Sequence, residues 1–187
     1  TSFREWALWL ADYAQSPEVS AQADYWVGVA QECPERLPVD LPDSDNTEAS
    51  ARSVTVALSA EETDRLLREA PPAYDTSVLN LLLAALGQAL GSWTGHDSVL
   101  LDLEGHGREN LTEQIDVSRT VGWFTALFPF RLPAGGLETM ARLELIKTGM
   151  AGIPDHGIGY GLLRYLGRDE DIRSRLQSLP APQVCFN

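Results

Sequence analysis

The chain has 187 residues, of which 44% are hydrophobic, and this length suits one substantial core. Its 14 lysines and arginines face 27 aspartates and glutamates, a formal net charge of −13, which argues against nucleic acid and anionic membranes as partners. No apolar run approaches the roughly 20 residues of a membrane-spanning helix, and no basic-then-apolar leader opens the chain. We therefore expect a cytoplasmic protein.

Two helices are predicted in the first thirty residues. Apolar residues recur at helical spacing from Phe3 to Ala14, and Ser16-Pro17-Glu18 ends this helix and begins another that runs to Ala30. Their aromatic residues are expected to pack in a core rather than to form a ligand site. Residues 31–51 are rich in proline and acidic residues, which indicates an exposed connector, either between domains or across one lobe.

Residues 52–187 are predicted to form an α/β core. Residues 52–58 alternate between polar and apolar side chains, as a half-buried strand does. Ser59 and Glu62 have the spacing of a capping box, which opens a helix. The expected elements are, in order, that helix through about Glu69 with Pro71-Pro72 at its end, a helix over 77–89 closed by Gly91 and Gly95, a strand over 98–103, a strand over 123–128, a helix over 137–150 and a strand over 183–186. Strands interleaved with helices indicate a layered fold.

A dense polar motif follows the strand over 98–103. It reads Glu104-Gly105-His106-Gly107-Arg108-Glu109, and its glycines allow unusual backbone angles and the close approach of another group. Charged side chains where a strand leaves the core indicate a catalytic or binding site. On spacing alone, a polar turn in which Glu104 pairs with Arg108 is an equal alternative.

Cysteine and histidine give no sign of a metal site. Cys33 and Cys185 lie far apart without metal-ligand spacing, so we expect two unpaired thiols in a reducing compartment. His96, His106 and His156 are isolated, with no His-x-x-x-His or Cys-x-x-Cys pattern.

Three further blocks follow the motif at 104–109. They are Arg119-Thr120-Val121-Gly122-Trp123-Phe124-Thr125, then Gly159-Tyr160-Gly161 preceded by Ile153-Pro154, and finally Phe186-Asn187. In this order the four blocks resemble those of the epimerization domains of nonribosomal peptide synthetases, and the first two agree with the family's blocks residue for residue. The resemblance covers most of the chain from about Asp97 onward and, more loosely, the helical start.

The resemblance implies an α/β, chloramphenicol-acetyltransferase-like fold, in which two lobes of layered sheet and helices surround a V-shaped cleft. Residues 1–187 correspond to part of the second, C-terminal lobe, with 1–51 as helical start and connector and 52–187 as α/β core. The family's His-His-x-x-x-Asp-Gly motif belongs to the first lobe, and no adjacent histidines occur in this chain. We therefore expect the isolated chain to be inactive without that lobe, and we expect the adjacent synthetase domains, including that lobe, as its partners.

The implied activity is that of an isomerase in the synthesis of antibiotics and other secondary metabolites. It inverts L to D at the α-carbon of an aminoacyl or peptidyl thioester, which hangs on the phosphopantetheine of a peptidyl carrier protein. The chain itself is expected to bind no cofactor. Removing the α-proton requires a base within hydrogen-bond reach, and inversion requires protons to be handled on both faces of an enolate-like intermediate.

The resemblance implies catalytic roles for three residues. Glu104 is the acid or base on one face of the intermediate, with the first lobe's histidine on the other. Arg108 orients Glu104 or neutralises charge near the phosphopantetheine, with a structural ion pair as the alternative. Asn187 hydrogen-bonds the developing enolate oxygen. The expected substrate-binding residues are His106, Trp123, Phe124, Thr125 and Tyr160.

Strand alternation lets only one face of residues 123–125 line a channel. A turn role for His106 and core packing for Tyr160 are the alternatives at those two positions.

Two other functions stay open for the whole chain. A condensation domain would join two carrier-bound acyl units, but it normally lacks the wording of the first two blocks. A non-catalytic lobe that docks carrier proteins is favoured for the isolated chain by the missing histidine motif.

Overall fold

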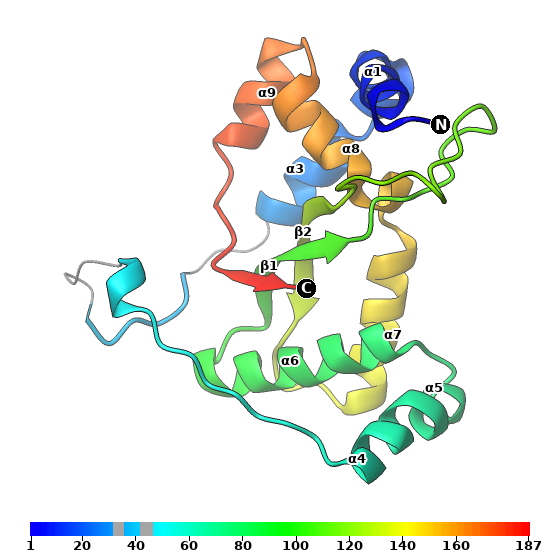
Figure 1. The fold of residues 1–187 in the computed structure, drawn as a ribbon. Coiled ribbons are helices and arrows are strands. Elements are labelled where there is room, and N and C mark those ends of the chain that lie inside the picture. The colour runs from blue at the N-terminus through cyan, green and yellow to red at the C-terminus, as the bar shows by residue number, and fades with distance from the viewer. Residues whose placement is uncertain (32–35, 42–46) are drawn as a thin grey trace.

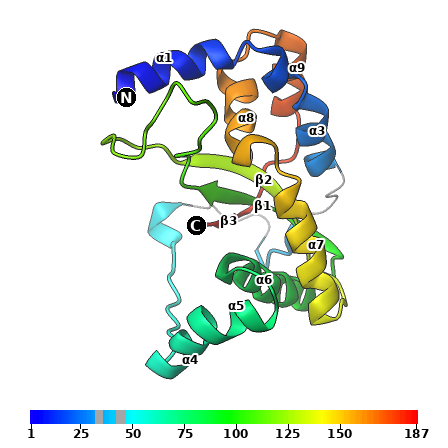
Figure 2. The same ribbon diagram turned by 90° about the vertical axis from the view of Figure 1, so that its right-hand side faces the viewer.

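The chain forms three layers, with helices on both sides of a small central sheet (Figures 1 and 2). The computed structural model describes residues 1–31, 36–41 and 47–187, so Cys33 lies outside the described residues. The sheet contains β1 (Ser98–Gly105), β2 (Ala126–Pro133) and β3 (Val184–Phe186) in the order β2-β1-β3. On one side lie α1 (Phe3–Tyr13), α3 (Ala23–Gln31), α8 (Ile158–Gly161) and α9 (Glu170–Gln177), and on the other α6 (Val78–Thr94) and α7 (Thr139–Ala151). The predicted α/β layered fold is confirmed.

The helical start agrees with the sequence pattern. A capping box begins α1, in which the Glu5 N–H donates to Ser2 Oγ and the Ser2 N–H donates to the Glu5 carboxylate. The second predicted helix is divided into α2 (Pro17–Ser20) and α3. Between them the Gln22 side chain extends to Asp155, and its amide donates a hydrogen bond of 2.7 Å to the Asp155 carboxylate.

Residues 52–58 do not join the sheet. They run extended and exposed from η1 (Glu48–Ser50) to α4 (Ala60–Asp64). Within the described part of the chain no strand lies beside them, and a strand requires a partner to form its ladder. The predicted strand is therefore absent from this structure, although its alternating pattern is intact.

Two predicted helix ends are wrong. The helix from Ser59 continues without a break as α4, η2 (Arg65–Glu69) and α5 (Ala70–Ala73). Pro71-Pro72 therefore lie within its last turn rather than beyond its end. Helix α6 passes through Gly91 and ends at Gly95, whose φ is 73°. Gly91 is not a stop; it lets α6 approach the backbone at Ala134.

One strand of the sheet begins later in the sequence than predicted. Strand β2 begins at Ala126 rather than at residue 123, and it pairs antiparallel with β1 from Ser98 opposite Pro133 to Gly105 opposite Ala126. Strand β3 and helix α7 lie close to where the sequence predicted them. No element was predicted over 158–177, which forms α8, η4 (Leu162–Leu166) and α9.

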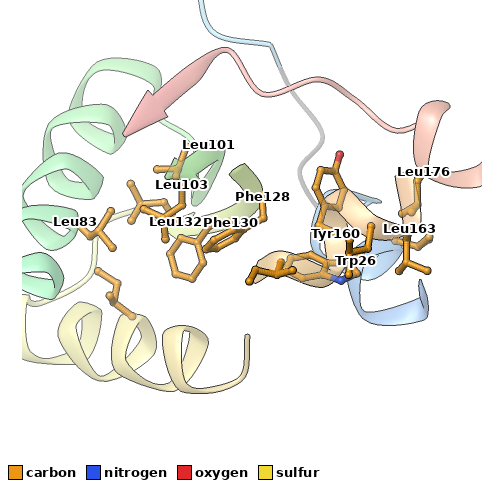
Figure 3. Packing of buried hydrophobic residues seen from close by; sticks show 14 of the residues in the cluster. Trp26, Leu83, Leu101, Leu103, Phe128, Phe130, Leu132, Tyr160, Leu163 and Leu176 are labelled. Carbon is orange, nitrogen blue, oxygen red and sulfur yellow. The ribbon is translucent and has the colours of Figure 1, made fainter. Parts of the chain in front are cut away.

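The core joins the sheet to both helical layers (Figure 3). Leu83, Leu101 and Leu132 are fully buried between α6 and the sheet. Trp26 of α3 is also fully buried, with ring centroids 6.0 Å from Phe128 and 5.4 Å from Tyr160. The indole of Trp26 therefore connects the sheet to the layer that contains α3 and α8.

Two glycines in helices provide a matched test of the packing of α6. A Cβ at Gly91 would overlap the carbonyl oxygen of Ala134, whereas a Cβ at Gly28 of α3 would meet nothing within 4 Å. We expect Gly91→Ala to lower the free energy of unfolding by about 2 kcal/mol. Gly28→Ala should raise it by roughly 0.5–1 kcal/mol, because alanine favours a helix. Urea unfolding of the domain that contains the chain measures both, and equal effects would contradict this packing.

Candidate active site

Glu104 lies at the end of β1, on the face away from the leucine core. Val99, Leu101 and Leu103 are buried on one face of this strand, so Asp102 and Glu104 project from the other. The Glu104 side chain is half-buried. Within the described residues its carboxylate has no hydrogen bond and no ion pair. The carboxylate is therefore available to a substrate or to another part of the protein.

The third strand brings Asn187 to the same place. Strand β3 runs parallel to β1, with Leu103 beside Phe186. The ladder ends there, and Asn187 follows Phe186 as the next residue, as Glu104 follows Leu103 on β1. The backbones of two of the three predicted catalytic residues, 83 positions apart in the sequence, therefore lie at the same end of the sheet.

Arg108 points away from Glu104. Its guanidinium donates to the carbonyl oxygens of Val117 (2.5 Å) and Gly122 (3.5 Å) and stands 4.1 Å above the ring of Phe124. No ion pair joins it to Glu104 in the part of the chain that the structure describes. The Glu104–Arg108 pair, one of the alternatives, is not formed in this structure. Arg108 instead holds the segment 117–124 in place, and its predicted role near the phosphopantetheine stays a prediction.

The close approach of the segment 117–124 requires a glycine at position 107, one of the two glycines of the motif. Gly107 has a φ of 66°, and a Cβ there would overlap the carbonyl of Phe124. Only glycine combines this backbone angle with this close approach. A Cβ at Gly105 would make ordinary contacts, at 3.5 Å or more.

A carboxylate lies between two histidines next to this loop. Nε2 of His106 is 3.4 Å from one oxygen of Glu109, and Nε2 of His156 is 3.8 Å from the other. His106 Nδ1 also accepts the backbone N–H of Arg108, at 3.0 Å. Both imidazoles are largely exposed. Glu109 therefore links the motif to η3 (Pro154–Gly157), and His106 bonds within the turn itself. The predicted contact of His106 with substrate stays a prediction.

Residues 123–125 precede β2 and form no strand, so the alternation predicted for them does not apply, and residues 121–123 are exposed in succession. Val121 and Trp123 are 94% and 81% exposed. Phe124 is buried, with its ring 5.3 Å from that of Phe3 and 6.0 Å from that of Trp6. Thr125 is half-buried. Phe124 is therefore a core residue in this structure, and Trp123 is the aromatic ring of the block that is free to meet another molecule.

Tyr160 is packed rather than open. It is 7% exposed, its ring lies against Trp26, and its hydroxyl accepts a hydrogen bond from Arg164. Burial raises the pKa of Tyr160, and the neighbouring Arg164 opposes that rise. The packing alternative for this residue fits the structure better than a substrate contact.

Asp102 was missed at this face because it lies within an apolar strand. It projects on the same side of β1 as Glu104, two residues earlier. Burial raises the pKa of the Asp102 carboxyl, and the positive charge of Arg164 lowers it less strongly. An acidic residue at the same strand parity as Glu104 was the signal that could have identified it.

Asp155 was also missed, and it fixes the loop before α8. Its carboxylate accepts hydrogen bonds of 2.7 Å from the Tyr13 hydroxyl and from the Gln22 amide. Burial and this carboxylate raise the pKa of Tyr13. Asp155 and His156 both have positive φ, at 45° and 51°, so these contacts hold a backbone conformation that costs energy.

Two kinds of site are absent from the residues described. No group of three or more histidine, cysteine, aspartate or glutamate side chains is arranged there to hold a metal ion. None of the helices in the described ranges is long and apolar enough to cross a membrane. Cys185 is a free, exposed cysteine.

Comparison with known proteins identifies the family. Residues 1–183 match the condensation domain family. The chain belongs to this family. Its whole length is 44% and 45% identical to parts of two linear gramicidin synthase subunits from Brevibacillus parabrevis, and it spans 4% of each. It is 37% identical to a part of tyrocidine synthase 1 from the same organism, of which it spans 17%.

Solved structures show the same fold in condensation-family domains. The epimerization domain from the third module of tyrocidine synthetase B superimposes with a TM-score of 0.89 at 34% identity, over 99% of this chain and 41% of that chain. The first condensation domain of the CDA synthetase gives a TM-score of 0.62 at 19% identity, over 94% of this chain and 36% of that chain. At this lower identity the second likeness shows the fold alone.

The contacts of Arg108 predict a local effect on the loop. We expect Arg108→Lys to speed amide hydrogen exchange over 117–123 by about tenfold or more, because a lysine cannot bond both carbonyls and stack on Phe124. The comparison is Arg119→Lys, an exposed arginine of the same segment. Unchanged exchange in Arg108→Lys would show that the guanidinium does not hold the loop.

The raised pKa of Asp102 predicts a dependence of stability on pH. The folded state binds this proton more tightly than the unfolded state, so the carboxylate costs stability at neutral pH and the cost disappears as the pH falls. We expect Asp102→Asn to raise the free energy of unfolding at pH 7. The gain should shrink towards the ordinary aspartate pKa of about 3.9. The control is the exposed Asp40→Asn, and a gain in Asp102→Asn that is independent of pH would refute the assignment.

Proposed function

We propose that the chain is part of the second lobe of an epimerization domain. The whole domain is then an isomerase that inverts L to D at the α-carbon of an aminoacyl or peptidyl thioester. The observation that carries this proposal is Glu104, a carboxylate without a partner among the described residues, at the end of a buried strand and at the same end of the sheet as Asn187. A base in such a place can reach a substrate without first breaking an ion pair.

The comparisons support an epimerization domain over its relatives. The solved epimerization domain is more similar in sequence and in structure than the condensation domain of the CDA synthetase. The blocks at 104–109 and 119–125 have the sequence motifs of epimerization domains. The curated relatives are subunits of peptide synthetases, which supports a place in antibiotic synthesis.

The proposed step moves one proton on each face of the substrate. Glu104 or the histidine of the first lobe takes the α-proton, and the electrons of the C–H bond move into the thioester carbonyl to form an enolate. The Asn187 amide donates a hydrogen bond to the enolate oxygen. The group on the opposite face then gives a proton back to the α-carbon, the carbonyl re-forms, and the configuration is inverted.

The proposed partners follow from this reaction. The substrate arrives on the phosphopantetheine arm of a peptidyl carrier protein, and the first lobe supplies the second acid or base. We assign a contact with one of them to Trp123, and its exposure supports this assignment. The free thiol of Cys185 supports action in the reducing cytoplasm.

Replacing the proposed base tests the function directly. In the complete domain, supplied with an L-aminoacyl carrier protein in heavy water, we expect Glu104→Gln to slow deuterium exchange at the α-carbon by at least about 100-fold, since general acid–base catalysis contributes on this scale. Glu113→Gln changes an exposed glutamate nearby and should leave exchange unchanged. Undiminished exchange in Glu104→Gln would remove Glu104 from the reaction.

The same assay separates the alternatives. A condensation domain, which the family match also allows, would form no D-product from a single aminoacyl carrier without an acceptor. Peptide formation without α-exchange by the complete domain would favour condensation. The isolated chain should show no exchange, because the first lobe's histidine is missing. A docking-only function predicts that the complete domain is inactive as well.

A further inference from the structure

The extended segment at 52–58 has the chemistry of a strand without a partner. Val54 and Val56 are 90% and 87% exposed, and Leu58 is 54% exposed. Ser53, Thr55 and Ala57 alternate with them. Figures 1 and 2 show the segment passing outside the layers, between η1 and α4. Side chains of this type favour strands because they pack well on a pleated, half-buried surface.

The apolar side chains of this segment are exposed to water, which is energetically unfavourable. Successive valines on one face would bury their side chains in a sheet, and here both faces are open. No charged residue lies between Arg52 and Glu61, although proteins usually place charges on strands that remain exposed. We therefore expect another part of the protein to bury this segment.

Both ends of the segment are already fixed. Downstream, the Ser59 hydroxyl and the Glu62 carboxylate close the capping box that begins α4. Upstream, the Ser50 hydroxyl accepts a hydrogen bond from the Thr47 N–H and donates one to the Thr47 carbonyl at the start of η1. These contacts limit the chain entropy that pairing would cost, so the segment is prepared for addition to a sheet.

We propose that residues 52–58 form a β-strand that pairs with a sheet edge in the rest of the same domain. The match covers 99% of this chain but only 41% of the solved epimerization domain, so most of such a domain lies outside these residues and is available to supply the edge. Val54, Val56 and Leu58 then face its core. This pairing does not depend on the epimerization reaction, since the other members of the family could use it as well.

A second copy of the chain is a less suitable occupant. The formal charge of −13 opposes association between identical copies. An edge within the same domain also acts at a high effective concentration. The two occupants differ in whether the pairing depends on protein concentration.

Amide hydrogen exchange of the complete domain tests the pairing. We expect the amides of residues 53–57 to exchange at least about 100-fold more slowly than those of the exposed residues Val39 and Asp40, at every protein concentration. Exchange as fast as at Val39 and Asp40 would overturn the proposal. Protection that appears only at high concentration would also overturn it, in favour of a second copy.

A pair of variants adds an independent readout. Val56→Asp should lower the melting temperature of the complete domain by several degrees, because it puts a charge against the proposed core. Val39→Asp, at an exposed valine of the connector that is 62% exposed, should leave the melting temperature unchanged. Equal melting temperatures for the two variants would contradict burial of Val56.

Discussion

The candidate site depends on the register of β1. This strand is bonded on one side to β2 and on the other to β3, and Val99, Leu101 and Leu103, all buried on one face, fix which face meets the main core. Because side chains alternate along a strand, a slip of one residue would turn Glu104 into the core and bring Leu103 out. The fully buried Leu101 makes such a slip costly. The direction of the Glu104 carboxylate is thus set by leucine packing, and the neighbouring Asn187 depends on the same ladder.

The first two sequence blocks form a single structural unit. Gly107 leaves room for the carbonyl of Phe124, and Arg108 bonds two carbonyls of the same segment while stacking on the Phe124 ring. Phe124 in turn packs on Phe3 and Trp6 of α1. The residues of the motif at 104–109, which the sequence suggests are all catalytic, therefore have different roles. Glu104 stays open to other molecules, Gly107 and Arg108 hold the loop, and Trp123 is presented outward on that loop.

The sequence correctly predicted those features that are determined by residues close to one another in the chain. The cap at Ser59, the left-handed Gly95 and the strands around Leu101 and Val184 follow from short-range chemistry and strand periodicity. What failed depends on distant contacts. Gly91 reads as a helix stop until the backbone of Ala134 lies against it, and Arg108 reads as a partner of Glu104 until the carbonyls of Val117 and Gly122 are in place. The alternation at 52–58 predicts a strand, but no pattern within a strand reveals its partner.

The central claim is that Glu104 meets the α-carbon of a carrier-bound thioester. The most direct measurement is a structure of the complete domain with a stable aminoacyl-pantetheine analogue. The account predicts a Glu104 carboxylate oxygen within about 3.5 Å of the α-carbon, which is the distance of a group positioned to react, with the Asn187 amide directed at the thioester oxygen. A Glu104 carboxylate turned away from the analogue, with another side chain at the α-carbon, would contradict it.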